Sequence, residues 1–412
     1  MFTKQRNVAN ALVEKLKRHY FLHKFEGITS SKELFVTTDF LLGKDKNMAL
    51  PSGSEKELCE RFLDFFNQKI FTIRTELDSQ QDSSVDFSSF DGLIFDTFEE
   101  VTDVEIIKVL KSSSPKTCDL DPIPTCLLLD CVENVAPFIT RIMNESLTKG
   151  IVPDCYKHAI IKPLLKKSSL NENDFNNFRP VSNLAFLSKL LEKLVLRQLS
   201  KHMKHNELEE IYQSAYKAFH STETALLKVT SDVLEQLDNK KVCFLILLDL
   251  SAAFDTIDHG ILLKRLRVTF GLSGTVLEWF QSYLSGRFQS VVVGGEKSTS
   301  SPLTLGVPQG SVLGPVLFTI YTQPLAEILT KHGMKYHLYA DDTQIYVSGT
   351  RDEIPEMSYR ISCCVTDVKA WMTCNKLKLN DDKTELLLID KDGYASHDTA
   401  VDINGHLINC TK

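Results

Sequence analysis

The stretch from residue 336 to 347, Tyr-His-Leu-Tyr-Ala-Asp-Asp-Thr-Gln-Ile-Tyr-Val, constrains the fold of this chain most strongly. Two apolar runs flank Asp341 and Asp342, and aspartate is among the few residues that a tight hairpin turn accepts. We predict a half-buried hairpin with these two aspartates as its loop, so that Leu338 pairs with Ile345. The hairpin would have one mostly apolar face and one more polar face.

Two carboxylates side by side at the tip of such a hairpin repel each other. A bound divalent cation would neutralise them, because oxygen ligands suit such ions. An ordinary solvated acidic turn explains this stretch alone equally well. The remaining motifs have to decide between these interpretations.

Composition places the chain among globular proteins, with 43% hydrophobic and 25% charged residues in 412. Its net charge of −7 excludes a uniformly basic nucleic-acid binder. The ten cysteines form no Cys-x-x-Cys pair and no zinc spacing with histidine, which predicts a reduced, intracellular protein. No apolar run approaches the ~20 residues of a membrane span, and no targeting signal favours the nucleus over the cytoplasm.

A second carboxylate follows the apolar run of residues 242–248 directly. This run predicts a strand that is buried on both faces and delivers Asp249 at its exit. Phe254 and Asp255 follow in a segment that should turn back into a helix near residues 260–270. A single aspartate at a strand end is more often a turn or cap residue.

Two cations stand near the ends of another predicted pair of strands. A ribbon of residues 159–167 and 178–182 would carry Lys166 and Arg179. Arginine by bidentate contact and lysine as a point charge suit a triphosphate. Taken alone, both are ordinary surface cations.

A glycine-rich loop, residues 306–315, precedes a predicted helix over 316–329. It lacks the lysine of a P-loop. Gly310 would allow a substrate to lie against the backbone, and Gln309 offers both a hydrogen-bond donor and an acceptor. Such a loop commonly solves only a packing problem. Hydrophobic periodicity and capping residues predict the other helices at 1–24, 55–77, 102–111, 126–149, 187–202, 222–237, 276–284 and 361–375, and further strands at 289–293 and 386–389.

The order of these motifs resembles the fingers and palm of a reverse transcriptase, and their residues resemble the motifs of the non-LTR (LINE-type) retrotransposon subclass. The matching blocks are Phe178-Arg179-Pro180-Val181-Ser182, Ser221-Thr222-Glu223-Thr224-Ala225-Leu226, Leu248-Asp249-Leu250-Ser251-Ala252-Ala253-Phe254-Asp255, Gly306-Val307-Pro308-Gln309-Gly310-Ser311, Tyr339-Ala340-Asp341-Asp342 and Leu379-Asn380-Asp381-Asp382-Lys383-Thr384-Glu385. The resemblance covers about residues 95–390.

The resemblance implies a catalytic set of carboxylates. Asp249 and Asp341 would hold two Mg²⁺ ions, with Mn²⁺ as an alternative and Asp342 as the supporting carboxylate. Lys383 would be a catalytic proton donor to the pyrophosphate.

The resemblance also implies a deoxynucleotide site. Phe254 would be the steric gate that rejects a 2′-hydroxyl, and Gln309 and Gly310 would line the incoming nucleotide. Lys166 and Arg179 would contact the triphosphate. The block from residue 118 to 125 would contact the template.

The fold expected from this resemblance is α+β, a right-hand fingers–palm with a small antiparallel palm sheet backed by helices. The thumb would be largely absent, because the chain ends soon after Lys383. The expected division is a helical N-terminal extension and linker (1–95), a segment ahead of the fingers with a template-contacting loop (96–160), fingers (161–240), palm (241–390) and a short C-terminal stub (391–412).

The resemblance implies RNA-directed DNA synthesis with deoxynucleotides, an RNA template (the element's own RNA among the candidates) and a DNA primer, without a membrane partner. The alternative is a truncated or co-opted product that binds RNA or primer–template without polymerising. An RNA-dependent RNA polymerase is disfavoured, because Phe254 fills space that a ribonucleotide needs. The sequence leaves the oligomeric state open.

Overall fold

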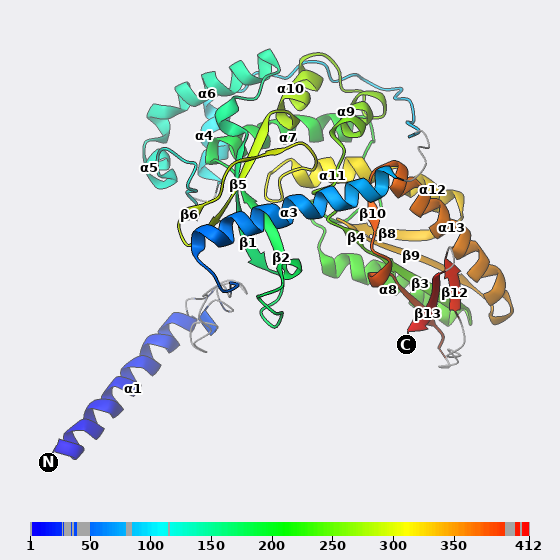
Figure 1. The fold of residues 1–412 in the computed structure, drawn as a ribbon, viewed down its shortest axis with the longest axis horizontal. Coiled ribbons are helices and arrows are strands. Elements are labelled where there is room, and N and C mark those ends of the chain that lie inside the picture. The colour runs from blue at the N-terminus through cyan, green and yellow to red at the C-terminus, as the bar shows by residue number, and fades with distance from the viewer. Residues whose placement is uncertain are drawn as a thin grey trace.

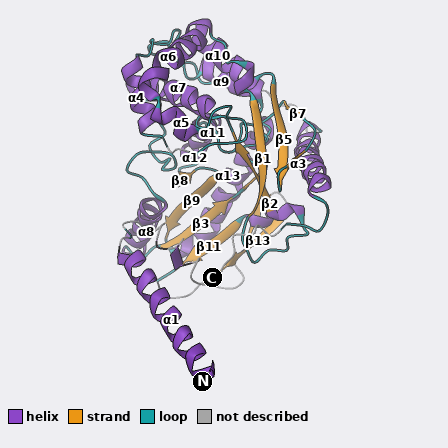
Figure 2. Ribbon diagram, turned by 90° about the vertical axis from the view of Figure 1, so that its left-hand side faces the viewer, coloured by secondary structure: helices purple, strands orange, loops and turns teal. Residues whose placement is uncertain are grey.

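Two β-sheets with helices packed around them make up most of the structure, a computed structural model (Figures 1 and 2). The structure describes residues 2–26, 28, 34, 37–38, 50–79, 85–113, 116–391, 400–403 and 406–411. This mixture of helices and sheets is α+β, as the sequence predicts.

The helices are α1 (Phe2–Glu26), α3 (Glu55–Asp78), α4 (Asp103–Lys111), α5 (Thr125–Asp130), α6 (Val132–Lys149), α7 (Phe186–His205), α8 (Thr222–Asp238), α9 (His259–Val268), α10 (Gly274–Leu284), α11 (Gly314–Thr322), α12 (Leu325–Lys331) and α13 (Ile354–Cys374). The strands are β1 (His158–Leu165), β2 (Phe178–Asn183), β3 (Val242–Leu248), β4 (Leu250–Ser251), β5 (Arg287–Val293), β6 (Glu296–Lys297), β7 (Ser301–Leu303), β8 (Lys335–Tyr339), β9 (Asp342–Gly349), β10 (Lys378–Leu379), β11 (Glu385–Ile389), β12 (Ala400–Ile403) and β13 (His406–Thr411). Single 3₁₀ turns are η1 (Asp154–Tyr156), η2 (Phe175–Asn177), η3 (Arg351–Glu353) and η4 (Asp381–Lys383).

The larger sheet has the strand order β12-β13-β11-β3-β9-β8, and all neighbours are antiparallel except β11 and β13. Apolar residues of β3 are buried on both faces, as predicted. Helix α8 packs Val229 and Val233 against Cys243 and Tyr346 on one face. The opposite face belongs to the main core, to which α13 contributes.

The predicted hairpin forms, but its register and its burial differ from the prediction. Tyr339 pairs with Asp342 and Leu338 with Thr343, so the loop residues are Ala340 and Asp341. Ala340 takes the left-handed conformation (φ +55°) that this tight turn requires. The shift is two residues, and it therefore leaves every side chain on its predicted face.

The hairpin is not half-buried, because α8 covers its more polar face. Tyr346 is 4% exposed, and its hydroxyl donates to Asp232 Oδ2 at 2.5 Å. His337 on the same face is also buried and lies 2.9 Å from the Ser214 hydroxyl. Protein groups thus satisfy Tyr346 and one ring nitrogen of His337, whereas His337 Nδ1 and Gln344 Oε1 are buried without a hydrogen-bond partner among the described residues.

The second sheet contains the predicted ribbon of β1 and β2, which pair antiparallel. Strand β5 adds to β1 in parallel, and β6 and β7 both pair with β5. The predicted boundary between residues 240 and 241 stays a prediction, but strand pairing crosses it, because β5 lies beyond it.

Helix α3 runs across the sheet that contains β1 and β5 and continues toward β10 and α13 (Figure 1). Near its start Phe62 packs against Phe178 of β2 and Phe66. Near its end Arg74 Nη2 donates to Asp258 Oδ2 at 2.7 Å. The helix therefore contacts both parts of the fold, whereas α1 extends away from them (Figure 1).

Several predicted helix ends are confirmed. Thr102 and Ser221 begin α4 and α8 with capping boxes, and Gly150 ends α6 with φ +63°. The helix predicted over 316–329 is wrong in one respect. It is divided into α11 and α12 at Pro324, because proline lacks an N–H and restricts the residue before it.

The helix predicted over 126–149 is likewise divided, at Cys131. Ser114 and Pro115, which precede the block from residue 118 to 125, lie outside the described residues, as does part of the predicted C-terminal stub. Strands β12 and β13 within that stub pair with each other, and β13 also pairs with β11. Among the described helices, none combines the length and apolar character needed to cross a membrane.

We expect Phe62→Ala to lower the free energy of unfolding by about 3–5 kcal/mol, because the fully buried ring leaves a cavity among three other aromatic rings. Phe71→Ala on the same helix is the matched control, since Phe71 is 64% exposed. Urea unfolding followed by circular dichroism measures both. Equal losses would mean that α3 does not dock through its aromatic face.

Candidate active site

Strand pairing brings the aspartates of two distant motifs together. In the register of β3 with β9, Leu248 pairs with Thr343. Asp249 directly follows β3 and Asp342 directly precedes Thr343, so the register brings these two residues close together at the sheet edge, where the charge of Asp249 acts on Asp342. Adjacent strands lie about 4.8 Å apart, and Asp341 follows in the hairpin loop. The three carboxylates therefore lie near one another, and their role in holding a metal ion stays a prediction.

The electrostatics of this group match its crowding. Burial raises the pKa of the Asp341 carboxyl, and the charge of Asp249 raises it further. Partial removal from water, together with Asp341 and Asp249, raises the pKa of Asp342. Lys383 opposes both shifts. Folding thus holds negative charges close together, and their repulsion lowers the stability of the folded state when both are ionised.

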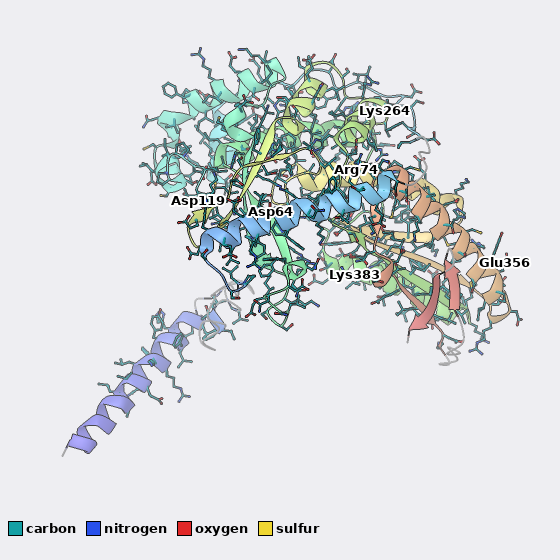
Figure 3. All side chains as sticks on the ribbon, viewed as in Figure 1. Asp64, Arg74, Asp119, Lys264, Glu356 and Lys383 are labelled. Atoms are coloured by element: carbon teal, nitrogen blue, oxygen red, sulfur yellow. The ribbon has the colours of Figure 1, made fainter. Side chains whose placement is uncertain are left out.

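On the other side of Asp249, the carboxylate meets two donors. Lys383 Nζ lies 2.9 Å and Asn380 Nδ2 3.1 Å from Asp249 Oδ2. The Asn380 backbone N–H also donates to the Asp249 carbonyl at 2.9 Å. Figure 3 places Lys383 between the β1–β2 ribbon and the larger sheet. Sequence reasoning found Lys383 and missed Asn380, although Asn380 stands in the same quoted motif.

The described residues contain no group of three or more His, Cys, Asp or Glu side chains arranged to hold a metal ion. Asp249 is hydrogen-bonded to Lys383 instead. The donor set still fits a divalent cation chemically, because its oxygens are hard ligands and its two raised pKa values reflect repulsion that a cation relieves.

The two predicted cations of the β1–β2 ribbon lie on the same side as these carboxylates. Lys166 follows β1 and donates to the Asn176 carbonyl at 2.7 Å, and Arg179 stands opposite Leu164 in β2. Burial lowers the pKa of Lys166, and the charges of Lys69, Lys383 and Arg179 lower it further. Sequence reasoning missed Lys69, which lies on α3.

Phe254, predicted as the gate, is partly buried and stacks on Phe318 with ring centroids 4.6 Å apart. Its carbonyl accepts from the Val307 backbone N–H at 2.9 Å. The ring is therefore held by the core and its backbone by the glycine-rich loop. Its place relative to a sugar stays a prediction.

The glycine-rich loop is fixed on both sides by protein. The Ser182 N–H donates to the Gln309 carbonyl at 2.7 Å, and a Cβ at Gly310 (φ +123°) would lie 2.3 Å from the Ser182 carbonyl oxygen. At Gly310 the chain's own backbone makes the close approach that the sequence suggested for a substrate. Nucleotide contact there stays a prediction.

The block from residue 118 to 125 is tied to the start of α7. Asp121 Oδ1 accepts from the Phe186 N–H at 2.6 Å, and its Oδ2 accepts from the Cys118 N–H at 2.7 Å. Cys118 Sγ also lies 3.5 Å from the Leu184 carbonyl oxygen. The loop thus stands beside the end of β2, and its contact with a template stays a prediction.

We expect Asp341→Asn to raise the thermal unfolding midpoint at pH 7 in the presence of a chelator. A carboxyl whose pKa rises on folding stabilises the folded state less once it is ionised, so the benefit of the amide should vanish near pH 4. Asp352→Asn is the control, because Asp352 is exposed. A gain at pH 4 as large as that at pH 7 would contradict the electrostatic cause.

Comparison with known proteins agrees with this arrangement. The family model described as reverse transcriptase (RNA-dependent DNA polymerase) matches residues 165–406. A probable RNA-directed DNA polymerase from transposon BS of Drosophila melanogaster is 28% identical over 291 residues, which are 68% of this chain and 31% of the relative. The RNA-directed DNA polymerase from mobile element jockey of the same species is 31% identical over 256 residues, 60% of this chain and 27% of the relative.

A third relative is the Pol polyprotein of type-1 retrotransposable element R1 from Bradysia coprophila, 26% identical over 313 residues, 76% of this chain and 30% of the relative. The chain spans less than a third of the length of these three relatives. The family match covers more than half of the chain and includes all three aspartates. The chain therefore belongs to the reverse transcriptase family, in the non-LTR (LINE-type) retrotransposon group.

Proposed function

We propose that this chain adds deoxynucleotides to the 3′-hydroxyl of a DNA primer under the direction of an RNA template. The observation that carries the proposal is the convergence of Asp249 and Asp342 through the β3–β9 register, with Asp341 next to them. In this proposal the larger sheet is the palm, and the β1–β2 ribbon belongs to the fingers.

Asp249, Asp341 and Asp342 would hold the divalent cations, with Mg²⁺ favoured and Mn²⁺ as an alternative, because all their donors are carboxylate oxygens. Bound cations would stabilise charge on the attacking and leaving oxygens of the transferred phosphoryl group. Asn380 supports this role, since its side chain and backbone donate to Asp249 and hold it at the sheet edge.

The cations of the site suit the rest of the nucleotide. Arg179 would grip phosphate oxygens through its guanidinium and Lys166 would add a point charge. The charge of Asp249 acts on Lys166, and the charge of Arg179 acts on Asp341, so both cations lie near the three aspartates. This proximity supports a shared substrate. Lys383 would leave Asp249 and give a proton to the departing pyrophosphate.

One contact favours a second function. Lys383 Nζ lies 2.9 Å from Asp249 Oδ2, so a protein cation already neutralises the central carboxylate. A chain that keeps this ion pair would bind RNA or primer–template without polymerising. The two functions differ in whether a divalent cation displaces Lys383.

Primer extension on poly(rA)/oligo(dT) with Mg²⁺ separates them. We expect the native chain to extend the primer, Asp341→Ala to abolish extension, and Asp352→Ala, an exposed control, to leave it unchanged. Binding of the hybrid by the native chain without extension would overturn the polymerase proposal and favour the second function.

We expect Phe254→Val to admit ribonucleotides, because a smaller side chain at the proposed gate leaves room for a 2′-hydroxyl. The ratio of kcat/KM for dTTP to that for UTP should fall at least tenfold, while kcat for dTTP changes less. The measurement is single-nucleotide incorporation on the same hybrid. An unchanged ratio would mean that Phe254 serves only to pack against Phe318.

A further inference from the structure

Asp255 is an acidic residue that the proposed reaction does not use. It lines a cavity of ≈ 40 Å³ between α3, β2 and the glycine-rich loop. The only charged residues lining this cavity, in the part of the chain that the structure describes, are Asp255 and Lys69. Burial raises the pKa of Asp255 to about 7, and Gln309 and Lys69 oppose the rise.

The carboxylate of Asp255 is engaged by one side chain. Gln309 Nε2 lies 3.0 Å from Asp255 Oδ1 and 2.9 Å from Oδ2. A carboxylate accepts only, so this contact fixes which end of the amide faces Asp255. One N–H of the amide is shared between the two carboxylate oxygens, so Gln309 Oε1 is turned away from Asp255, and Oε1 has no hydrogen-bond partner among the described residues.

The backbones of both partners are also held in place. Ser182 donates to the Gln309 carbonyl, and Val307 donates to the carbonyl of Phe254, directly before Asp255. A Cβ at Gly306 would lie 2.7 Å from the Asp255 Cα. Both main chains are therefore held in place, and the contact with Asp255 is what holds the Gln309 side chain.

We propose that Asp255 is a positioning residue that turns the Gln309 amide so that its carbonyl oxygen faces the incoming nucleotide. The proposal rests on the proposed function. It assigns a ligand chemistry to the Oε1 atom of Gln309, which can meet only a hydrogen-bond donor such as a hydroxyl or an amino group. The charged contacts to phosphate are left to Lys166 and Arg179.

The contact of Asp255 with Gln309 should depend on pH, because the charge of Asp255 does. Lys69 of α3 faces Asp255 across the cavity, and the next charged groups of the turn are engaged elsewhere: Asp258 with Arg74, and His259 Nε2 at 2.7 Å from the Gly306 carbonyl oxygen. Below about pH 7 a protonated Asp255 becomes a donor and competes for Gln309 Oε1. We therefore expect KM for the nucleotide to rise as the pH falls from 8 to 6.

The first test replaces Asp255 with asparagine. Asp255→Asn keeps the shape but offers both an oxygen and an N–H, so it no longer fixes which end of the Gln309 amide faces it. KM for dTTP should therefore rise about three- to tenfold, the effect of one hydrogen bond, with kcat little changed. The double variant Asp255→Asn with Gln309→Glu inverts donor and acceptor while again presenting an oxygen to the nucleotide, and KM should recover.

The outcomes of this test are distinct. A KM for Asp255→Asn equal to the native value would overturn the proposal. So would a fall in kcat together with a lowered unfolding midpoint and no recovery in the double variant, because Asp255 would then be only a structural residue. The KM rise at low pH should also disappear in Asp255→Asn.

A second measurement does not need turnover. The side-chain amide signal of Gln309, in ¹⁵N-glutamine-labelled protein and identified by its loss in Gln309→Glu, should titrate near pH 7 and stop doing so in Asp255→Asn. Added dTTP should shift the same signal in the native chain. A signal that ignores pH or dTTP would overturn the positioning role, whereas a signal that responds to both in a chain that extends no primer would overturn the polymerase proposal alone.

Discussion

The pairing of β3 with β9 is the constraint on which the candidate site depends. It joins two strands that are buried on both faces, and it brings Asp249 close to Asp342 at the edge where both strands leave the core. A slip of one residue would turn every side chain of β3 to the other face, so burial of the sheet also protects the register of the carboxylates. The apolar core thereby holds together charges that repel each other, as the raised pKa values of Asp341 and Asp342 indicate.

Three strands, not two, define the surroundings of Asp249. Strand β11 lies on the far side of β3, and the segment before it supplies Asn380 and Lys383. Asp249 is therefore influenced by groups from both sides of β3: Asn380 and Lys383 bond its Oδ2 atom, and its charge acts on Asp341 and Asp342. Such mixing of repelling and compensating charge is typical of sites where pKa values are perturbed for function.

Many of these elements can be predicted from the sequence, because they depend on residues that are close together in the chain. The apolar run before Asp249, the capping residues of α4 and α8 and the β1–β2 ribbon all depend on neighbours in the chain. The predicted hairpin register differs from the observed one by two residues, because a shift of two leaves the same side chains on each face. The positive φ of Ala340 is what distinguishes the observed register from the predicted one. Asn380, Lys69 and the contact of Asp255 with Gln309 depend on long-range packing, which no local pattern encodes.

Helix α3 lies outside the stretch that the family model matches, and it is attached by two different kinds of contact. Its first half is held by aromatic packing on β2 and β5, which has no preferred direction and allows small sliding. Its last turns are held by ion pairs, Arg74 with Asp258 and Asp78 with Lys376, which are directional and screened by salt. A helix of 24 residues is about 36 Å long and resists compression. It therefore links the sheet of β1 and β5 rigidly to the segments that carry Asp258 and Lys376. A change in their separation requires either sliding along the aromatic contacts or loss of the ion pairs, and high ionic strength favours loss of the ion pairs.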